Sequence, residues 1–404
     1  MAIALLALVL RVAARAYTGS EDFWRNGYAF YFELAQNIAV GTGMSFDGHT
    51  PTTFRVPLYP AFLAAVTLGH KVFLPVVFAQ SLIGTATVVA AALLTAELFG
   101  STAAITCAAF TAVYPYYVVH DTALQETGLF TFFTLVSVLL LIRARRTMSG
   151  ILAVLAGLAL AADVLTRATI VPFALLAPLW LGWAGVGIWR KRVRAAVLCA
   201  AVMVVAVAPW LIRSYALTGF PTLSTETGSQ LWAGNNPYTF SYYPLRSIDL
   251  GLAAALDALP ANEMAELHEL GSDGVLEDRW FLRKALTFIR EHPWLTLGNG
   301  IRKIGAAFSW LPNPRRSFWT SLIYALSYGP IMTLGLLGMM LTWRSWREHS
   351  LIYALFLSFI IVTAVFFGHT GHRSYLDVYW IASSAYVLTR WIRPLGQLPV
   401  WERP

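Results

Sequence analysis

The sequence predicts an all-α polytopic membrane protein. Of the 404 residues, 57% are hydrophobic and only 12% are charged, which is far more apolar than a soluble domain. The apolar residues gather in about ten segments that approach the roughly 20 residues a helix needs to cross a bilayer. These segments lie near residues 2–16, 74–98, 102–118, 126–142, 149–164, 168–188, 195–216, 318–342, 350–367 and 375–391.

The net charge of +8 is explained by membrane topology, so no nucleic-acid partner is expected. Basic residues cluster at 143–146, 190–194, 344–347 and 390–393, in short loops or at the start of the tail. Cytoplasmic loops carry an excess of Lys and Arg, so all four clusters are placed on the cytoplasmic side of the plasma membrane. Arg11 and Arg15 interrupt the first apolar segment, and a cleavable signal is therefore not expected.

Two longer segments then face outward. The first is the outer loop 17–73, which belongs to a transmembrane module over 1–216. The second is 217–317, which forms an outward-facing cap. Residues 318–404 then form the C-terminal helices and tail. Within the two outward-facing segments, 57–69 is too short to span and 294–311 carries Arg302 and Lys303, so both are expected to lie at the membrane surface.

The first outer loop has the pattern of a binding site. Residues 28–40 show a helical, amphipathic spacing that ends at Gly41 and Gly43. Glu21 and Asp22 precede this helix and Arg55 follows it, before a proline-rich turn. This order predicts a site for an anionic headgroup beside a carboxylate base. The alternative is that the two acids cap or solvate the loop.

A second constellation lies at the junction of two apolar segments. Tyr114, His120, Asp121 and Glu126 occupy it, and Glu126 stands at the start of an apolar helix. Ionisable groups at that depth usually face the protein interior and carry function. The alternative for Glu126 is helix-start chemistry, because acids are favourable at a helix N-terminus.

Three arginines are expected at the same outer face. Arg167 and Arg213 end apolar segments, and Arg373 follows His372 in the last outer loop. Guanidinium groups bind a phosphate bidentately, so together they predict a lipid-phosphate site. An ion pair with Asp163, one turn earlier, is the alternative for Arg167.

The sequence predicts no disulfide and no metal site. Cys107 and Cys199 lie within apolar stretches. The spacing His369-x-x-His372 could ligate a metal, but no carboxylate-rich partner is fixed nearby. No cofactor is therefore assigned, although a divalent metal is compatible with the sequence.

At these residues the chain resembles the GT-C glycosyltransferases, in particular the group related to dolichyl-phosphate-mannose–protein mannosyltransferases and to the bacterial aminoarabinose transferase of lipid A. The matching motifs occur in family order and cover most of the chain. They are Tyr31-x-x-Leu34-Ala35, Gly41-x-Gly43, Arg55-x-Pro57-Leu58-Tyr59-Pro60, Tyr114-Pro115 with Glu126, Leu165-Thr166-Arg167, Pro209-Trp210-x-x-Arg213, Leu231-Trp232-x-Gly234-Asn235-Asn236-Pro237 and His372-Arg373.

The resemblance implies an inverting hexosyl- or pentosyltransferase that uses a polyprenyl-phosphate sugar at the outer membrane face. The acceptor would be a glycan, a lipid or a protein. By position, Arg55 matches the family's basic phosphate contact, and Glu126 matches the acid that follows the second outer loop. Donor contacts are expected from Arg55, Tyr59, Arg167, Arg213, His372 and Arg373, and acceptor or sugar contacts from Tyr114, Asp121, Asn235 and Asn236.

The chain departs from the family pattern at the catalytic base. The family acid usually lies a few residues before the tyrosine, where this chain has Arg25-Asn26-Gly27. Asp22 is therefore the expected base and Glu21 the second choice, with Glu126 as a further catalytic candidate.

Two other functions fit the sequence. One is a transporter or flippase of lipid-linked substrates, but such proteins favour midplane ionisable groups and paired halves, and this sequence shows neither. The other is a catalytically inactive relative, which Asn26 in the acid region suggests.

Overall fold

The computed structural model describes residues 1–270 and 274–390, and within them the predicted all-α fold is confirmed. The regular elements of these residues are helices, apart from one isolated bridge between Ser45 and Pro51. Apolar side chains cover the interior faces of the helices, so the core is a bundle of packed helices.

Five segments of the described residues are long and apolar enough to cross a membrane, which identifies a multi-pass membrane protein. They are α1 (Ala2–Asn26), α4 (Leu74–Phe99), α7 (Thr127–Thr147), α10 (Trp189–Thr218) and the stretch Phe318–Val365, which contains α16 (Phe318–Leu341) and α17 (Trp346–Val365). Shorter apolar helices are α3 (Leu58–Thr67), α5 (Ser101–Val113), α8 (Gly150–Thr166) and α9 (Val171–Ala184), and α18 (Asp377–Thr389) completes the bundle.

The sequence predicted about ten spans. The stretch Phe318–Val365 covers two of them, and four others form the shorter helices α5, α8, α9 and α18. The helix expected over 102–118 stops at Val113, and α6 (Pro115–His120) starts separately after it. Outside the predicted spans, Pro260 likewise separates α12 (Gly251–Asp257) from α13 (Ala261–Glu269).

The first helix is longer than predicted. The sequence placed an outer loop from residue 17, but α1 continues to Asn26 through a kink at Gly19, whose φ is 81° and ψ 173°. Glycine adopts this backbone conformation without the steric penalty of a side chain. Glu21 and Asp22 therefore lie on a helix and not in a loop, whereas the helix predicted over 28–40 is confirmed as α2 (Ala29–Ala39).

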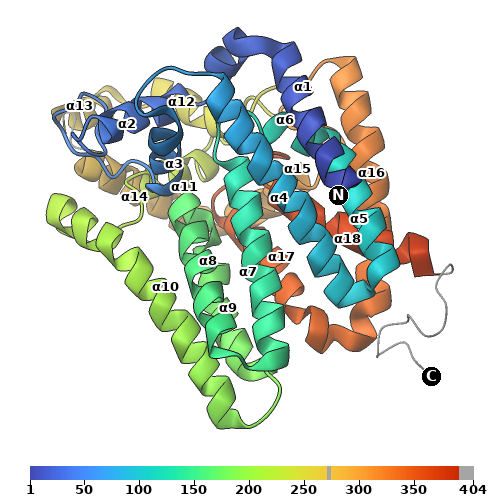
Figure 1. The fold of residues 1–404 in the computed structure, drawn as a ribbon. Helices are drawn as coiled ribbons and strands as arrows, with labels where there is room; N and C mark the ends of the chain where they lie inside the picture. The colour runs from blue at the N-terminus through green and yellow to red at the C-terminus, as the bar shows by residue number, and fades with distance from the viewer. Residues whose placement is uncertain (271–273, 391–404) are drawn as a thin grey trace.

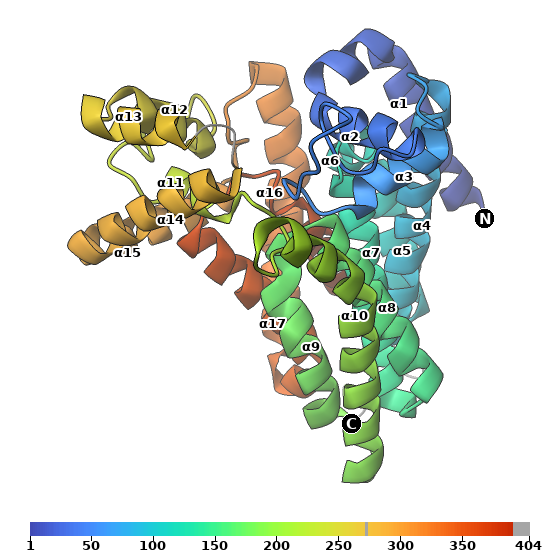
Figure 2. The same cartoon turned by 90° about the vertical axis from the view of Figure 1, so that its left-hand side faces the viewer.

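The polar segments collect at one end of the bundle. Figures 1 and 2 show α2 and α3 at the same end as the cap helices, above the long helices α7 to α10. We call residues 217–317 the cap. Its helices are α11 (Thr227–Gly234), α12, α13, α14 (Gly274–Glu291) and α15 (Pro293–Ala307).

Three basic loops meet at the opposite end. Arg145, Arg192 and Arg347 line one cavity of about 390 Å³ between the ends of α7, α9, α10 and α17. These three clusters therefore lie on one side of the molecule, away from the cap (Figure 1). Their assignment to the cytoplasm stays a prediction, and the end of the fourth cluster falls outside the described residues.

Small residues of α16 allow helix α18 to pack closely in the centre of the bundle. Gly335 and Gly338 of α16 face Trp380 and Ser383 of the buried helix α18. A Cβ at Gly335 would lie 2.8 Å from the Trp380 ring and 2.9 Å from Trp380 Cα. Close backbone approach at small residues is the usual way in which membrane helices pack.

We expect Gly335→Ala to destabilise the protein, because the new methyl group meets backbone that cannot move aside. Overpacking of this kind costs about 1–3 kcal/mol, which thermal unfolding in detergent would show as a lower Tm. The matched control is Gly298→Ala in α15, where an added Cβ meets nothing within 4 Å and helix propensity favours alanine. Equal melting temperatures for the two variants would contradict this packing.

Candidate functional site

The candidate site is built around a buried ion pair where α7 begins and α8 ends. Glu126 immediately precedes α7, and Arg167 immediately follows α8. Glu126 Oε1 accepts hydrogen bonds from Arg167 Nη2 at 2.5 Å and from Arg167 Nε at 3.0 Å. The Arg167 guanidinium also lies 4.8 Å from the centre of the Phe130 ring. Both partners of this pair were site candidates in the sequence.

Glu126 keeps one oxygen available. Burial acts to raise the pKa of Glu126, but the Arg167 charge and hydrogen bonds outweigh it and hold the pKa below its ordinary value. The group is therefore a carboxylate at neutral pH. Its second oxygen, Oε2, is buried and accepts no well-aligned hydrogen bond among the described residues, although the Tyr31 hydroxyl lies close enough to interact with this carboxylate. A buried acceptor of this kind calls for a functional explanation.

A second ion pair joins the first outer loop to the cap. Arg55 pairs with Glu226, the residue before α11. The Arg55 guanidinium lies 5.3 Å from the Phe30 ring and 5.1 Å from the Phe54 ring, so aromatic side chains fix its position. Arg55 Nε is buried and has no acceptor in the part of the chain that the structure describes.

Electrostatic effects link the two pairs into one cluster. The charges of Arg167 and Arg55 both lower the pKa of Glu126. Burial lowers the pKa of His372, and the same two arginine charges add to that effect after its neighbour His369. Arg55, Glu126, Arg167 and His372 therefore lie within electrostatic reach of one another, although they come from four separate parts of the sequence.

Two tyrosines underlie this cluster. Tyr31 of α2 packs edge-on against Tyr59 of α3, with 4.9 Å between ring centres. Burial and the Glu126 charge raise the pKa of Tyr31. Tyr59 is enclosed, and its hydroxyl lies 3.4 Å from Gln80 Oε1. Tyr59 thus packs against Tyr31 and holds its ring in place.

Arg213 holds the loop that carries Arg55. Its Nη1 donates to Thr52 O at 2.9 Å and its Nη2 donates to Met44 O at 3.2 Å. One turn earlier, Trp210 Nε1 donates to Leu223 O at 3.0 Å. The end of α10 therefore fixes both the first outer loop and the start of the cap. Arg213 was predicted to contact phosphate, whereas in the structure its guanidinium donates hydrogen bonds to backbone carbonyls.

The two acids proposed from sequence as bases have other partners. Asp22 Oδ2 lies 2.9 Å from Arg15 Nη1, and Asp22 Oδ1 accepts a hydrogen bond of 2.7 Å from Asn26. Glu21 is exposed and lies 3.6 Å from Arg25. That Asp22 or Glu21 acts as the catalytic base stays a prediction, and these partners do not favour it.

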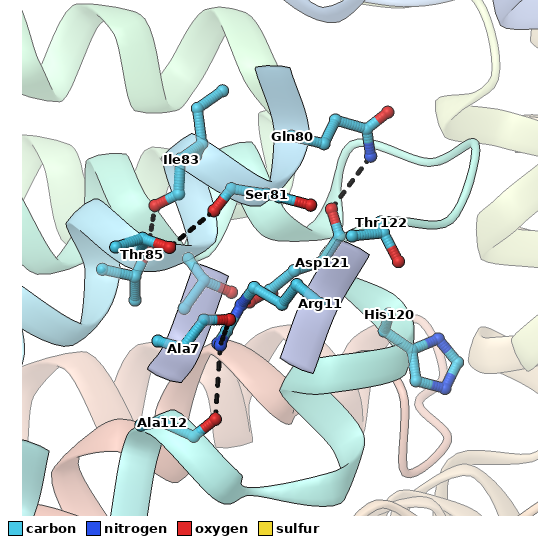
Figure 3. Close-up of polar contacts among 12 residues, drawn as sticks. Ala7, Arg11, Gln80, Ser81, Ile83, Thr85, Ala112, His120, Asp121 and Thr122 are labelled. Carbon is cyan, nitrogen blue, oxygen red and sulfur yellow. Dashed lines mark hydrogen bonds and ion pairs between the residues drawn. The ribbon is translucent and has the colours of Figure 1, made fainter. Parts of the chain in front are cut away.

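Asp121 anchors the first helix. Arg11 Nε of α1 lies 2.8 Å from Asp121 Oδ2, and Arg11 Nη1 donates to Ala112 O at 3.3 Å. Gln80 of α4 donates to Asp121 O at 2.9 Å (Figure 3). The Asp121 carboxylate is thus bound to α1 in the interior, just before the turn that leads to Glu126.

Arg373 and Tyr114 belong to a different buried cluster. Arg373 Nη2 donates to the Tyr324 hydroxyl at 2.7 Å, and the guanidinium lies 3.4 Å from the Tyr328 ring centre. The Tyr114 hydroxyl donates to Asp377 Oδ2 at 2.9 Å, and Arg373 lies 3.6 Å from Asp377 Oδ1. Arg373 is fully enclosed, so this cluster joins α16 and α18 to the end of α5.

The predicted asparagines close the end of α11. Asn235 Nδ2 donates to Val365 O at 2.8 Å, and Asn235 Oδ1 accepts from Lys303 at 3.1 Å. Asn236 Nδ2 donates to Trp232 O at 2.7 Å. Asn235 thus joins the cap to the end of α17, whereas Asn236 bonds within the cap.

The described residues do not fit a metal centre. His369 and His372 stack with 3.7 Å between ring centres. However, no group of three or more His, Cys, Asp or Glu in residues 1–270 and 274–390 is arranged to hold a metal ion.

Glu226 is the site residue that sequence reasoning missed. It stands shortly before the Leu231-Trp232-x-Gly234-Asn235-Asn236 motif, which pointed to this segment but not to its acid. Burial raises the pKa of Glu226 to about 7, the charges of Asp278 and Glu126 act in the same direction, and Arg55 opposes them.

A family comparison confirms the predicted resemblance. Residues 52–212 match the model of the family described as dolichyl-phosphate-mannose-protein mannosyltransferase. This range contains Arg55, Glu126 and Arg167 and ends before Glu226. No curated protein sequence is similar enough to this chain to count as a match.

Solved structures of the Archaeoglobus fulgidus oligosaccharyltransferase share the fold. The complex with zinc and sulfate has a TM-score of 0.55 at 14% identity, over 96% of this chain and 49% of that one. The form tethered to an acceptor peptide has a TM-score of 0.57 at 16% identity, with the same coverage of 96% and 49%. The complex with an inhibitory peptide and a dolichol-phosphate has a TM-score of 0.53 at 12% identity, over 96% and 50%. This chain thus spans about half the length of the archaeal enzyme and shares the fold of the matched part.

We expect the stability of the protein to fall with rising pH because of Glu226. Its folded pKa of about 7 exceeds the ordinary 4.5, so its contribution is full below about pH 4.5 and is lost as pH rises through about 7. This shift corresponds to a destabilisation on the order of 3 kcal/mol at high pH. Glu226→Gln should lessen the fall in Tm between about pH 5 and pH 8, and the exposed Glu269→Gln should not. Identical pH profiles for all three proteins would contradict a strained Glu226 carboxylate.

Proposed function

We propose that this chain is a membrane glycosyltransferase that moves a sugar from a polyprenyl-phosphate donor to an acceptor hydroxyl, with inversion at the sugar carbon. The observation that carries the proposal is the cluster at the cap end of the bundle. It holds two guanidiniums and two carboxylates, with Arg55 Nε and Glu126 Oε2 lacking a well-aligned hydrogen bond among the described residues. The family match over 52–212, which includes most of this cluster, supports the same activity.

The arginines of the cluster suit a phosphate leaving group. As the bond between the sugar carbon and the phosphate oxygen breaks, its electron pair stays on the polyprenyl phosphate. Guanidinium groups stabilise this developing charge through charge-assisted hydrogen bonds. Arg55 has a free donor for this contact, and Arg167 adds a second positive charge from the other side of the cluster.

Glu126 has two tasks in this proposal. Its Oε1 fixes the Arg167 fork, so that the arginine is oriented before the donor binds. Its Oε2 accepts a hydrogen bond from a hydroxyl of the sugar or the acceptor, which satisfies a buried oxygen that otherwise accepts no well-aligned hydrogen bond among the described residues. Because the pKa of Glu126 is lowered, we assign it a positioning and binding role.

The membrane location follows from the donor. A polyprenyl tail requires an apolar environment, and the cluster lies where the long helices give way to the polar cap (Figure 2). With the basic loops in the cytoplasm, the site faces the outer side of the plasma membrane. The acceptor, whether a glycan, a lipid or a protein, would approach from the cap side.

The experiment is a transfer assay with the purified protein in liposomes. Radiolabelled polyprenyl-phosphate mannose is the first donor, and the glucose and arabinose analogues follow. Label that appears in an acceptor, or as free sugar released to water, supports a transferase. Label that crosses the bilayer with its phosphate bond intact supports the flippase alternative. Neither event with any donor would support the inactive relative.

We expect Arg55→Ala to raise the KM for the donor by roughly 10–100-fold and to change the KM for the acceptor much less. A hydrogen bond to a charged group contributes about 1.5–3 kcal/mol, and Arg55 supplies such bonds to the phosphate. The control is Arg25→Ala, which removes an exposed arginine close to the same loop. Equal weakening of donor and acceptor use would argue against a phosphate contact at Arg55.

A further inference from the structure

We infer that Glu226 is the general base of the transfer and accepts the proton of the attacking acceptor hydroxyl. This inference rests on the proposed glycosyltransferase activity and names the group that the acid region of the first outer loop does not supply. The sequence offers Arg25 and Asn26 where the family acid is expected, and neither can accept a proton.

Backbone contacts place Glu226 next to Arg55. Thr225 N donates to Thr53 O at 3.1 Å, and Ser224 Oγ donates to Phe54 O at 2.7 Å. The two segments therefore run side by side in opposite directions, and the Arg55 and Glu226 side chains reach across them to form the ion pair. This ion pair holds the Glu226 carboxylate against the proposed phosphate contact.

The other side of Glu226 is held by α14. Asp278 Oδ1 accepts hydrogen bonds from Gly228 N at 2.6 Å and from Ser229 N at 3.2 Å, so it caps the first turn of α11. Gly228 is required there, because a Cβ would overlap the Asp278 carbonyl oxygen. Glu226 is thus fixed between the first outer loop and α14 of the cap, as a reacting group must be.

The surroundings of Glu226 favour proton uptake near neutral pH. Three charged groups face it, namely Arg55 from the first outer loop, Asp278 from α14 and Glu126 from the start of α7. The side chain is 10% exposed, and burial is the main cause of its pKa of about 7. A base is most effective when its pKa lies near the working pH. Glu126, whose pKa is lowered, is a weaker proton acceptor.

Donor binding would activate this base. Arg55 is both the partner of Glu226 and the proposed phosphate contact. When a phosphate takes up the Arg55 N–H groups, the carboxylate loses part of its compensating charge and becomes more basic. The acceptor oxygen then forms its bond to the sugar carbon, its proton goes to Glu226, and the polyprenyl phosphate leaves with the electron pair of the broken bond.

A structural ion pair that only closes the cap is the competing explanation. Two observations favour catalysis. Arg55 Nε is buried without an acceptor among the described residues, so the guanidinium retains a donor for a phosphate beside Glu226. The cap is also already attached to the first outer loop by the backbone contact between Thr225 and Thr53, so the charges are not needed for that purpose.

The test compares Glu226→Gln, Glu226→Ala and Asp22→Asn in the liposome transfer assay. We expect Glu226→Gln to lower kcat by about 10²–10⁴-fold, the usual contribution of a general base, and Asp22→Asn to lower it far less. Binding of farnesyl phosphate, followed by tryptophan fluorescence, should persist in Glu226→Gln, which shows that the donor site is intact. Glu269→Gln in the cap is the exposed control.

Azide distinguishes chemistry from structure. It attacks the sugar carbon without giving up a proton, so it needs no base, and it should restore turnover of Glu226→Ala as glycosyl azide. Transfer by Glu226→Gln within fivefold of wild type, or azide rescue of Asp22→Ala and not of Glu226→Ala, would overturn the inference. Absence of transfer and hydrolysis by the wild-type protein with every donor would instead remove the proposed function itself.

Discussion

The pairing of charges where the membrane bundle meets its cap is the constraint on which the candidate site depends. An unpaired charge is costly in such a setting, and removing one partner of a buried pair leaves the other uncompensated. Glu126 with Arg167, and Arg55 with Glu226, satisfy this requirement by joining parts of the chain that are remote in sequence. Because each pair bridges different elements, closing the fold and assembling the site are the same event.

The arginines of this face divide into two groups. Arg11, Arg213 and Arg373 give their N–H groups to carboxylates, hydroxyls or backbone carbonyls in the interior, and they hold α1, the first outer loop and α18 in place. Arg55 and Arg167 pair with carboxylates within the cluster. Arg55 has a buried donor without an acceptor among the described residues, and so do Arg11 and Arg373 in their interior positions. Membrane depth and residue type alone cannot separate these groups, since only the identity of each partner does so.

Sequence reasoning recovered the elements and part of the site. The helix at 28–40, the all-α class and the family resemblance follow from periodicity and short motifs, which are local properties. Glu126 and Arg167 were both selected because an ionisable group at a helix end is conspicuous. Glu226 was missed because it and its partner Arg55 lie on irregular segments. Irregular segments have no hydrophobic periodicity from which their contacts could be predicted. The kink at Gly19, through which α1 continues, was missed because Gly19 is followed by Ser20, Glu21 and Asp22, a polar pattern that predicts the end of a span.

The short helix α11 has a consequence for protein engineering. It starts beside Glu226 and ends at Gly234, where any side chain would overlap the carbonyl oxygen of Phe366. The helix therefore fixes the distance between the Glu226 carboxylate and the turn that follows α17. A chimaera that exchanges caps with a relative, to change which acceptor is modified, should transplant residues 44–55, 222–236 and 365–366 as one block. Helix α14 belongs to the same block, because Asp278 caps α11 and Trp280 packs against Trp232.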